Sequence, residues 1–444
     1  MSKQKSRFVC QQCGHVAATW MGRCAECGAW NSLLEEVAQA AGRPRRPSAP
    51  IALPLTQIAQ GDGGEVRLRV GIGEMDRVLG GGLVTGSVVL LGGDPGVGKS
   101  TVLLIAMAAF AHRGVRVLYV SGEESARQVR LRADRLGIAS DELYLLADTS
   151  LAAVREAVEQ VQPRVLVLDS VQTLHDPDLD GTPGTISQVR AVAAAAVQLA
   201  KGRDIATFLV GHVTKEGTLA GPRALEHLVD TVLYFEGDGS SSLRILRATK
   251  NRFGSTGEIG MFEMREDGLV DVPDASARLL KERASDAAGT VVTCTMEGSR
   301  PLLVEVQALV GANVNPTPSR TALGFDRNRL SLLLAVLGKA GLPLSDHDVF
   351  VSVAGGVRIG EPAVDLAVAV AIHSSFTGQV VPADLLVIGE IGLVGELRGV
   401  SQPLARLREA ARHGFRAALV PASTPEDESG LRLRRCAMLR EAIE

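Results

Sequence analysis

Short apolar runs alternate with longer helix-like stretches through the middle of the chain. The apolar runs have the length of buried strands and lie at residues 88–92, 115–120, 165–169, 206–212, 231–236 and 243–249. The stretches predicted to be helices lie at residues 101–112, 125–136, 151–160 and 185–201. Strands that alternate with helices usually pair in parallel and are covered on both faces. The pattern therefore predicts an α/β fold with a mostly parallel sheet.

The segments before and after the central region are predicted to form separate domains. A second α/β unit is predicted at the C-terminal end, with strands at residues 290–297 and 302–309 and a helix at residues 327–338. A length of 444 residues is enough for two or three domains with cores of their own. We expect a cysteine-rich module, a basic Pro-rich linker, a nucleotide-binding domain and a C-terminal domain, at residues 1–34, 35–54, 55–275 and 285–444.

A glycine-rich segment follows the first strand of the central region. It matches Gly-x-x-x-x-Gly-Lys-Ser/Thr in full, as Gly93, Asp94, Pro95, Gly96, Val97, Gly98, Lys99 and Ser100, and a predicted helix begins at Thr101. Backbone N–H groups and the positive end of the helix favour phosphate groups there. Lys99 can reach the outer phosphates, and Ser100 can hold Mg²⁺. The segment predicts a nucleoside triphosphate site, and ATP is the expected ligand.

Carboxylates end two of the predicted strands. Asp169 ends an apolar strand and is expected to assist Mg²⁺ binding. Glu123 follows another strand and is the preferred base for the attacking water, with Glu124 as the reserve. The alternative is that both acids cap the helix that follows them. His212 ends a further strand and could sense the γ-phosphate. The loop after it, residues 214–223, is either a phosphate contact or a solvated turn.

Four of the six cysteines lie within the first 27 residues, in two Cys-x-x-Cys pairs. Cys10, Cys13, Cys24 and Cys27 have the spacing and chemistry of a tetrahedral Zn²⁺ site. All four positions are thiolates, so the zinc is predicted to be structural and to drive the folding of a module too short for its own core. The two tryptophans, Trp20 and Trp30, lie in this module and are expected to be packing residues.

Composition narrows the choice of partners and compartment. The net charge is −3 and aromatic residues make up 3% of the chain, so any nucleic-acid site must be local and base stacking is not expected to dominate it. No apolar run is long enough for a membrane span. The polar N-terminus does not have the pattern of a signal peptide. The sequence favours the cytoplasm.

Taken together, these motifs resemble the RadA (Sms) family of bacterial DNA-repair proteins. The resemblance rests on the four cysteines, the phosphate-binding loop and the pentapeptide Lys250-Asn251-Arg252-Phe253-Gly254, and it covers essentially the whole chain. It implies a RecA-like ATPase related to hexameric helicases, a homo-oligomeric ring and a nucleoid-associated location. It also implies action on single-stranded and branched DNA, branch migration and cooperation with the RecA recombinase. Glu123 matches the family's catalytic acid.

The pentapeptide carries two cations at the end of a predicted strand. In ring ATPases a cation from the neighbouring subunit neutralises charge that develops on the γ-phosphate, and Lys250 and Arg252 are candidates for that role. Direct contact with DNA phosphates and simple surface exposure are the alternatives.

The C-terminal unit resembles the proteolytic domain of Lon protease but lacks its nucleophile. Where that family has a catalytic serine this chain has Ala363, and near the position of the catalytic lysine it has Leu404. A Ser–Lys pair for acyl transfer is therefore missing. The domain is expected to be an inactive scaffold for ring assembly, with a basic surface for DNA that includes Arg320, Arg327 and Arg329.

The favoured hypothesis is a DNA-dependent ATPase that acts as an ATP-driven translocase or helicase. The alternative is a DNA-bound adaptor, in which ATP only switches conformation and the zinc module recruits a recombinase. An ATP-dependent protease is disfavoured by Ala363 and Leu404.

Overall fold

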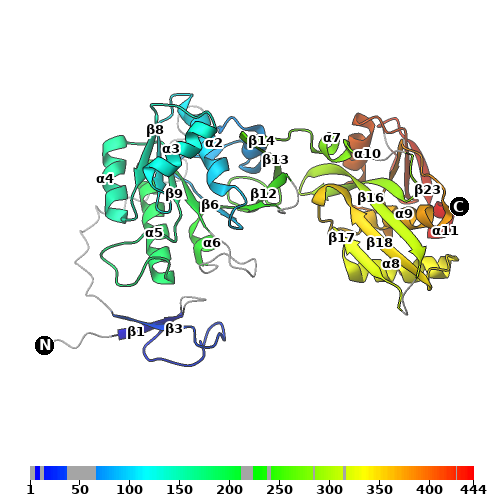
Figure 1. The fold of residues 1–444 in the computed structure, drawn as a ribbon, viewed down its shortest axis with the longest axis horizontal. Helices are drawn as coiled ribbons and strands as arrows, with labels where there is room; N and C mark the ends of the chain where they lie inside the picture. The colour runs from blue at the N-terminus through cyan, green and yellow to red at the C-terminus, as the bar shows by residue number, and fades with distance from the viewer. Residues whose placement is uncertain are drawn as a thin grey trace, which may run out of the picture. The chain divides into compact units, whose positions relative to one another are not determined.

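The computed structural model divides the chain into two compact units, Met1–Asp271 and Val272–Glu444, and each is described by itself (Figure 1). It describes residues 6–10, 15–37, 67–211, 224–237, 242–283, 286–313, 317–426 and 428–444. Within these ranges, none of the helices combines the length and the apolar character needed to cross a bilayer.

The N-terminal module is a small antiparallel sheet. Its three strands are β1 (Ser6–Cys10), β2 (Val16–Ala17) and β3 (Leu33–Val37), in the order β2-β1-β3. Among the residues of the module that the structure describes, the buried cluster consists of Cys10, Ala17, Cys24 and Leu33, with Phe8 packed against it. Two of the four buried members are cysteines, so this cluster offers little apolar burial to stabilise the module.

The central region forms a nine-stranded sheet in the order β14-β13-β12-β11-β6-β10-β9-β7-β8. The six strands from β11 to β8 in this order are parallel, and β12, β13 and β14 continue the sheet in antiparallel fashion. The predicted mostly parallel α/β fold is confirmed. The strands are β6 (Val88–Gly93), β7 (Val117–Ser121), β8 (Leu143–Ala147), β9 (Val165–Asp169), β10 (Ala206–Val210), β11 (Thr231–Glu236), β12 (Leu243–Asn251), β13 (Ile259–Arg265) and β14 (Gly268–Asp271), and a two-stranded sheet, β4 (Arg67–Leu68) with β5 (Leu83–Val84), precedes them.

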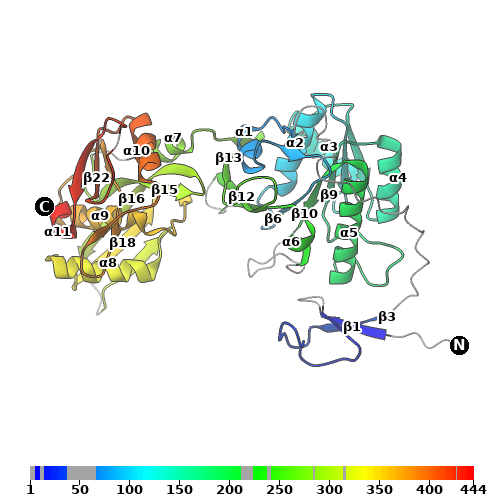
Figure 2. The same ribbon diagram turned by 180° about the vertical axis from the view of Figure 1, so that it is seen from behind.

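Alternate residues of the parallel strands face two separate cores. One core joins Val89 and Leu91 of β6 to three helices, and the other joins Val88 and Leu90 to three more. Figures 1 and 2 show the sheet between these two groups of helices. The first group is α1 (Gly73–Val78), α2 (Lys99–Ala111) and α3 (Ala126–Arg135), and the second is α4 (Leu151–Val161), α5 (Ile186–Arg203) and α6 (Ala224–Leu228). Burial on both faces explains why these strands are continuous apolar runs.

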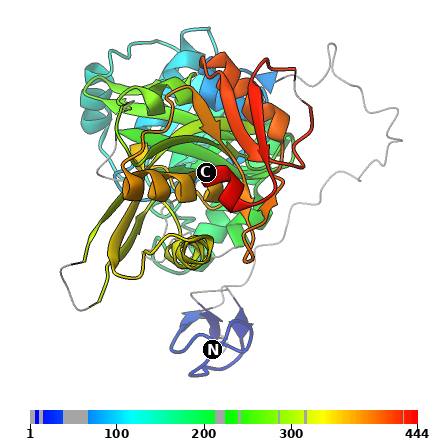
Figure 3. The ribbon, with the colours of Figure 1, turned by 90° about the vertical axis from the view of Figure 1, so that its right-hand side faces the viewer.

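The C-terminal unit is built on a seven-stranded mixed sheet in the order β17-β18-β16-β15-β19-β22-β23. Figure 3 views this unit from the side of the C-terminus. The strands are β15 (Thr290–Glu297), β16 (Arg300–Ala312), β17 (Arg320–Leu323), β18 (His347–Val353), β19 (Leu385–Val387), β22 (Ala417–Pro421) and β23 (Arg432–Cys436), and a short pair, β20 (Glu390–Ile391) with β21 (Leu397–Arg398), lies outside the sheet. The helices are α7 (Ala275–Leu280), α8 (Arg327–Ala340), α9 (Asp365–Thr377), α10 (Pro403–Arg412) and α11 (Leu439–Ile443), with short 3-10 turns η2 (Ala354–Gly356) and η3 (Pro362–Val364).

A buried ion pair ties the elements of this unit together. Arg406 of α10 has no exposed surface, and its guanidinium donates to both carboxylate oxygens of Glu361, at 2.7 Å each. It also donates to the backbone carbonyls of Cys294 and Ser401. Burial by itself would raise the pKa of Glu361, but the hydrogen bonds and charge of Arg406 outweigh it and hold that pKa below its ordinary value.

We expect Arg406→Ala to destabilise the C-terminal unit by about 3–5 kcal/mol, because it leaves the carboxylate of Glu361 without its cation. The measurement is urea unfolding with hydrogen exchange of α10 and β15. The control is Arg408→Ala on the same helix, at an exposed position, which should change stability by less than about 0.5 kcal/mol. Equal effects of the two substitutions would contradict this account.

Candidate nucleotide site and metal centre

The glycine-rich loop joins the end of β6 to the start of α2. Gly98 precedes α2 with a φ of +110°, so the helix begins at Lys99, two residues before its predicted start. At Gly93, a Cβ atom would lie 2.3 Å from the carbonyl oxygen of Phe235 on the neighbouring strand, which only glycine avoids. The first N–H groups of α2, including those of Ser100 and Thr101, have no partner within the helix and can bind an anion.

Lys99 is folded back over this loop and is almost completely buried. Its ammonium donates to the carbonyl oxygens of Gly93 at 2.8 Å and of Asp94 at 2.9 Å. Burial lowers the pKa of Lys99, and the nearby charges of Asp169, Glu123 and Asp94 act in the opposite direction. The ammonium of Lys99 therefore lies between the phosphate-binding loop and the nearby carboxylates.

Asp169 lies at the end of β9, beside the end of β7, and is 6% exposed. The hydroxyl of Tyr119 donates to its carboxylate at 2.5 Å. Burial raises the pKa of Tyr119 well above its ordinary value, the charge of Asp169 adds to this, and a hydrogen bond with Ser100 opposes it. Tyr119 thus connects the two residues expected to serve Mg²⁺. We did not predict this role; a polar aromatic residue inside an otherwise apolar strand was the available signal.

The two acids after β7 have different partners. Glu123 is exposed and accepts a hydrogen bond from the hydroxyl of Ser170, at 2.6 Å, directly beyond Asp169. Glu124 instead pairs with Arg132 of α3, at 2.5 Å. The start of α3 is capped separately, because the side chain of Gln128 accepts from the backbone N–H of Ser125. Glu123 therefore hydrogen-bonds on the side of Asp169, while Gln128 supplies the hydrogen bond at the start of α3.

Lys250 and Arg252 lie at the other end of the sheet. Asn251 is paired with Thr231 at the start of β11, whereas Gly93 is paired with Phe235 near its end. Four residues of strand separate the two ends, on the order of 13 Å. The pentapeptide cations therefore do not approach the nucleotide site of their own chain.

Both pentapeptide cations have partners inside the chain. The ammonium of Lys250 donates to the carbonyls of Glu226, at 2.5 Å, and Val229, at 2.8 Å, at the end of α6. Burial and then the charge of Arg252 lower the pKa of Lys250. Arg252 is half-exposed and pairs with the buried Asp230 at 3.1 Å. The other oxygen of Asp230 accepts from the backbone of Val88. The pair therefore connects the pentapeptide to the first residue of β6.

Three cysteines of the N-terminal module converge. The sulfur atoms of Cys10, Cys24 and Cys27 all lie within 4.8 Å of one another, and those of Cys10 and Cys27 are 3.6 Å apart. Three thiols at this spacing fit a tetrahedral Zn²⁺, which prefers sulfur ligands. Cys13, the predicted fourth ligand, and His212 with the loop at residues 214–223 lie outside the described residues.

Two of the arginines expected to offer a basic surface in the C-terminal unit are engaged internally. The guanidinium of Arg329 donates two hydrogen bonds to the buried Asp365, at 2.5 Å each. Arg320 donates to the backbone carbonyls of Leu344 and His347. Because these contacts occupy both guanidinium groups, the expectation of a shared DNA surface is not supported for them, while Arg327 remains exposed.

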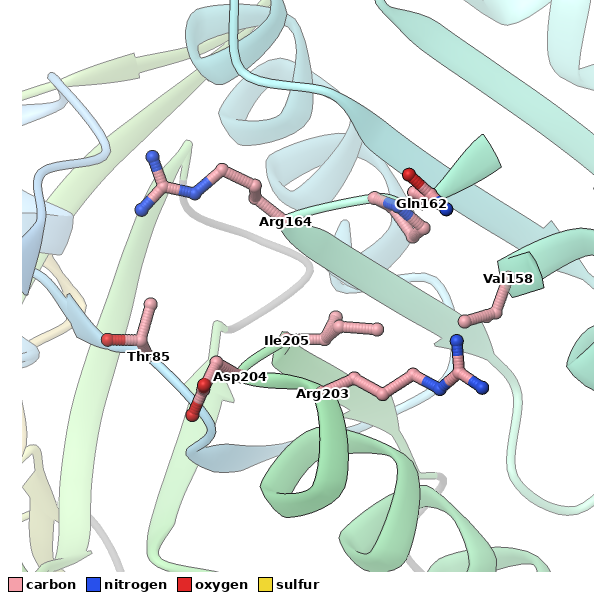
Figure 4. A pocket seen from close by; sticks show the side chains of 8 residues that line it. Thr85, Val158, Gln162, Arg164, Arg203, Asp204 and Ile205 are labelled. Atoms are coloured by element: carbon pink, nitrogen blue, oxygen red, sulfur yellow. The ribbon is translucent and has the colours of Figure 1, made fainter. Parts of the chain in front are cut away.

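A pocket of about 360 Å³ in the central domain lies apart from these residues. Figure 4 shows Arg164 and Arg203 at its edge with their guanidinium groups pointing to opposite sides. Its lining comes from the segments that precede β6, β9 and β10, at the amino ends of the strands. Phosphate-binding loops lie at the carboxyl ends, so this pocket is not the nucleotide site.

Three family models match separate segments of the chain. Residues 68–218 match a family described as AAA domain, residues 8–35 one described as rubredoxin metal binding domain, and residues 320–424 one described as subunit ChlI of Mg-chelatase. A KaiC-like protein from Pyrococcus horikoshii is 21% identical with a TM-score of 0.39, covering 47% of this chain and 99% of its own.

Relatives named DNA repair protein RadA match nearly the full length. That of Bacillus subtilis is 49% identical and covers 95% of this chain and 94% of its own. The relative from Streptococcus pyogenes serotype M6 is 50% identical, and the match covers 95% of this chain and 93% of the relative. The relative from Pseudomonas aeruginosa is 49% identical, and the match covers 100% of this chain and 99% of the relative.

The fold and site define a RecA-like P-loop ATPase with an N-terminal zinc ribbon and a C-terminal Lon-like domain. An ATPase of this class implies a nucleotide and Mg²⁺, and a zinc ribbon implies zinc. The relatives are 49–50% identical over nearly the full length, which identifies the family. The chain belongs to the RadA family of DNA repair proteins.

We expect the purified protein to contain about one zinc ion per chain and Cys24→Ser to lose it, since a thiolate ligand and a core residue are removed together. Zinc released on thiol modification provides the measurement. Cys436→Ser, a substitution in the other unit, is the control and should retain the metal. Full zinc content in Cys24→Ser would rule out this metal centre.

We expect Tyr119→Phe to destabilise the central domain by about 1.5–3 kcal/mol, because Asp169 loses a hydrogen bond to its charge. It should also raise the Mg²⁺ concentration needed for half-maximal ATP hydrolysis. Urea unfolding and Mg²⁺ titrations measure the two effects. Tyr144→Phe, at an exposed position of β8, removes the same hydroxyl and should change neither. An unchanged Mg²⁺ requirement in Tyr119→Phe would separate this tyrosine from the metal site.

Proposed function

We propose that this protein hydrolyses ATP at the loop between β6 and α2. Lys99 and the backbone from Gly93 to Thr101 would hold the phosphates, while Ser100 and Asp169 would hold Mg²⁺. Glu123 would orient and deprotonate the attacking water. The observation that carries the proposal is the convergence of Lys99, Asp169 and Glu123 at the carboxyl ends of adjacent parallel strands.

We further propose that Lys250 and Arg252 serve the nucleotide of a neighbouring subunit. Their place at the opposite end of the sheet from the P-loop supports this role. In a ring, one subunit can present that end to the nucleotide of the next. The half-exposed Arg252 is the better candidate for direct contact, and Lys250, bound to the end of α6, would hold the segment in place. His212 remains a proposed γ-phosphate sensor.

The family assignment supports a role in DNA repair and recombination. We propose a DNA-dependent translocase or helicase that acts on single-stranded and branched DNA, promotes branch migration and works with the RecA recombinase. We expect the protein to form a homo-oligomeric ring, as a hexamer. Its expected location is the cytoplasm, in association with the nucleoid. The four segments at residues 1–34, 35–54, 55–275 and 285–444 would be its working parts.

The C-terminal domain is proposed to be a scaffold without protease activity. Ala363 is buried and has no hydroxyl to act as a nucleophile. The side chain of α10 that reaches the neighbouring Glu361 is Arg406, and not Leu404. A guanidinium stays protonated in proteins and cannot serve as the base that a Ser–Lys pair requires.

The test is ATP hydrolysis with and without single-stranded DNA. DNA should stimulate hydrolysis, and both Lys99→Ala and Arg252→Ala should abolish the stimulation, with nucleotide binding preserved in Arg252→Ala. Arg265→Ala is the matched control, since Arg265 is also half-exposed and paired with a carboxylate on the same sheet.

Mixing the two inactive variants tests the subunit arrangement. Some neighbours in mixed rings would combine an intact Lys99 site with an intact Arg252, so activity should reappear above that of either variant alone. Absence of recovery would contradict action across subunits. Hydrolysis indifferent to DNA would favour an adaptor in which ATP is only a switch.

A further inference from the structure

Both tryptophans of the chain are exposed on the surface of the zinc ribbon. Trp20 is 56% and Trp30 is 72% exposed. The sequence led us to expect packing residues, but the ribbon is too small to bury two indoles. Each exposed indole leaves a large apolar area in water, and neighbouring exposed apolar groups mark a contact surface.

The two rings flank a glycine. A Cβ atom at Gly22 would lie 3.8 Å from the ring of Trp20 and 3.9 Å from the ring of Trp30, so both indoles border the same bare stretch of backbone. The backbone of Gly22 also accepts a hydrogen bond from Asn31, and Arg23 pairs with Trp30 in a short antiparallel bridge. The positions of the two indoles are thus set by the hairpin that carries Cys24 and Cys27.

A cation accompanies the aromatic pair. The guanidinium of Arg23 lies 5.8 Å from the centre of the Trp30 ring, and its Nε donates to the carbonyl of Gly28 at 2.8 Å. That hydrogen bond fixes a positive charge beside the exposed indole. Stacking rings with an adjacent guanidinium are the features that proteins use to bind single-stranded nucleic acids without sequence preference.

The charge distribution of the chain points to the same ligand. The first 50 residues hold seven Lys and Arg against three Asp and Glu, whereas the whole chain has a net charge of −3. Five of these seven cations, at positions 3, 5, 43, 45 and 46, come before and after the ribbon in the sequence, whereas residues 6–37 hold two Arg and three Glu. The tryptophans therefore lie in a nearly neutral ribbon between two basic segments of an acidic chain. Basic segments attract a polyanion, while an exposed aromatic surface alone would serve a protein partner equally well.

We propose that Trp20 and Trp30 form a stacking platform for the bases of single-stranded DNA, with Arg23 beside them. The proposal rests on the DNA-dependent function proposed above and assigns part of the DNA contact to the ribbon. Paired bases in a duplex do not expose their faces, so the platform distinguishes unpaired from paired DNA. Zinc would then act in DNA binding indirectly, because the hairpin that carries two of its ligands also sets the positions of both indoles.

The chain offers a direct readout, because its intrinsic tryptophan fluorescence comes from these two residues alone. The full-length protein without nucleotide is titrated with an oligodeoxythymidylate of about 16 nucleotides. The reference ligand is an abasic strand of the same length, which has the phosphates but no bases. Stacking predicts strong quenching by the first ligand and little by the second. Trp20→Phe and Trp30→Phe each leave one reporter and should still be quenched.

Trp20→Ala and Trp30→Ala should each weaken binding of the oligodeoxythymidylate about tenfold, measured by anisotropy of a labelled strand. Leu34→Ala is the matched control, because Leu34 is 55% exposed on the same ribbon and should leave binding unchanged. Zinc content measured for every variant establishes that the ribbon is intact.

The outcomes separate this proposal from the proposed function. Stimulation of ATP hydrolysis by DNA without base-dependent quenching overturns the platform and leaves the function standing. Quenching without stimulation supports the platform and overturns the DNA-dependent motor. Equal quenching by the abasic strand overturns stacking in favour of phosphate contact. No response to DNA, together with a spectral shift on addition of a recombinase filament, overturns it in favour of a protein partner.

Discussion

The central domain depends on one buried carboxylate, that of Asp169, which lies at the end of an apolar strand and needs polar partners there. Isolated burial of a charge is costly, so its neighbours have to compensate. Tyr119 donates to it from the adjacent strand, and Lys99 lies nearby on the loop. A parallel sheet makes this possible because it brings the carboxyl ends of distant chain segments to a single edge. The nucleotide site is the result.

The C-terminal unit also holds a partly buried carboxylate, but pairs it with a cation. Arg406 is completely buried and neutralises Glu361 with two hydrogen bonds, beside the turn that holds Ala363. There the guanidinium and the carboxylate are paired with each other. In the central domain the ammonium of Lys99 donates to two backbone carbonyl oxygens, with three carboxylates nearby. The two buried cations therefore differ in their partners: Arg406 is paired with a carboxylate, and the hydrogen bonds of Lys99 go to backbone carbonyls.

The same sheet separates the two ends at which a ring ATPase acts. The phosphate-binding loop lies at the carboxyl ends of the parallel strands, and the pentapeptide lies at the opposite end, tied to β6 through Asp230. Strand β6 joins the two ends, since Val88 begins this strand and Gly93 ends it. In the proposed ring, β6 would connect the nucleotide of one subunit with the contact that this subunit makes to the next.

The sequence by itself determined the elements whose signal is local. Buried parallel strands are continuous apolar runs, and the glycine-rich loop and paired cysteines are contiguous motifs, so the α/β fold, the P-loop and the zinc ribbon followed directly. The edge strand β8 was not predicted because most of its side chains are partly exposed. Only the tertiary structure showed that Tyr119 meets Asp169, that Arg406 pairs with Glu361 and that two tryptophans remain on the surface. Those contacts join residues far apart in the chain, and burial is a property of the folded molecule.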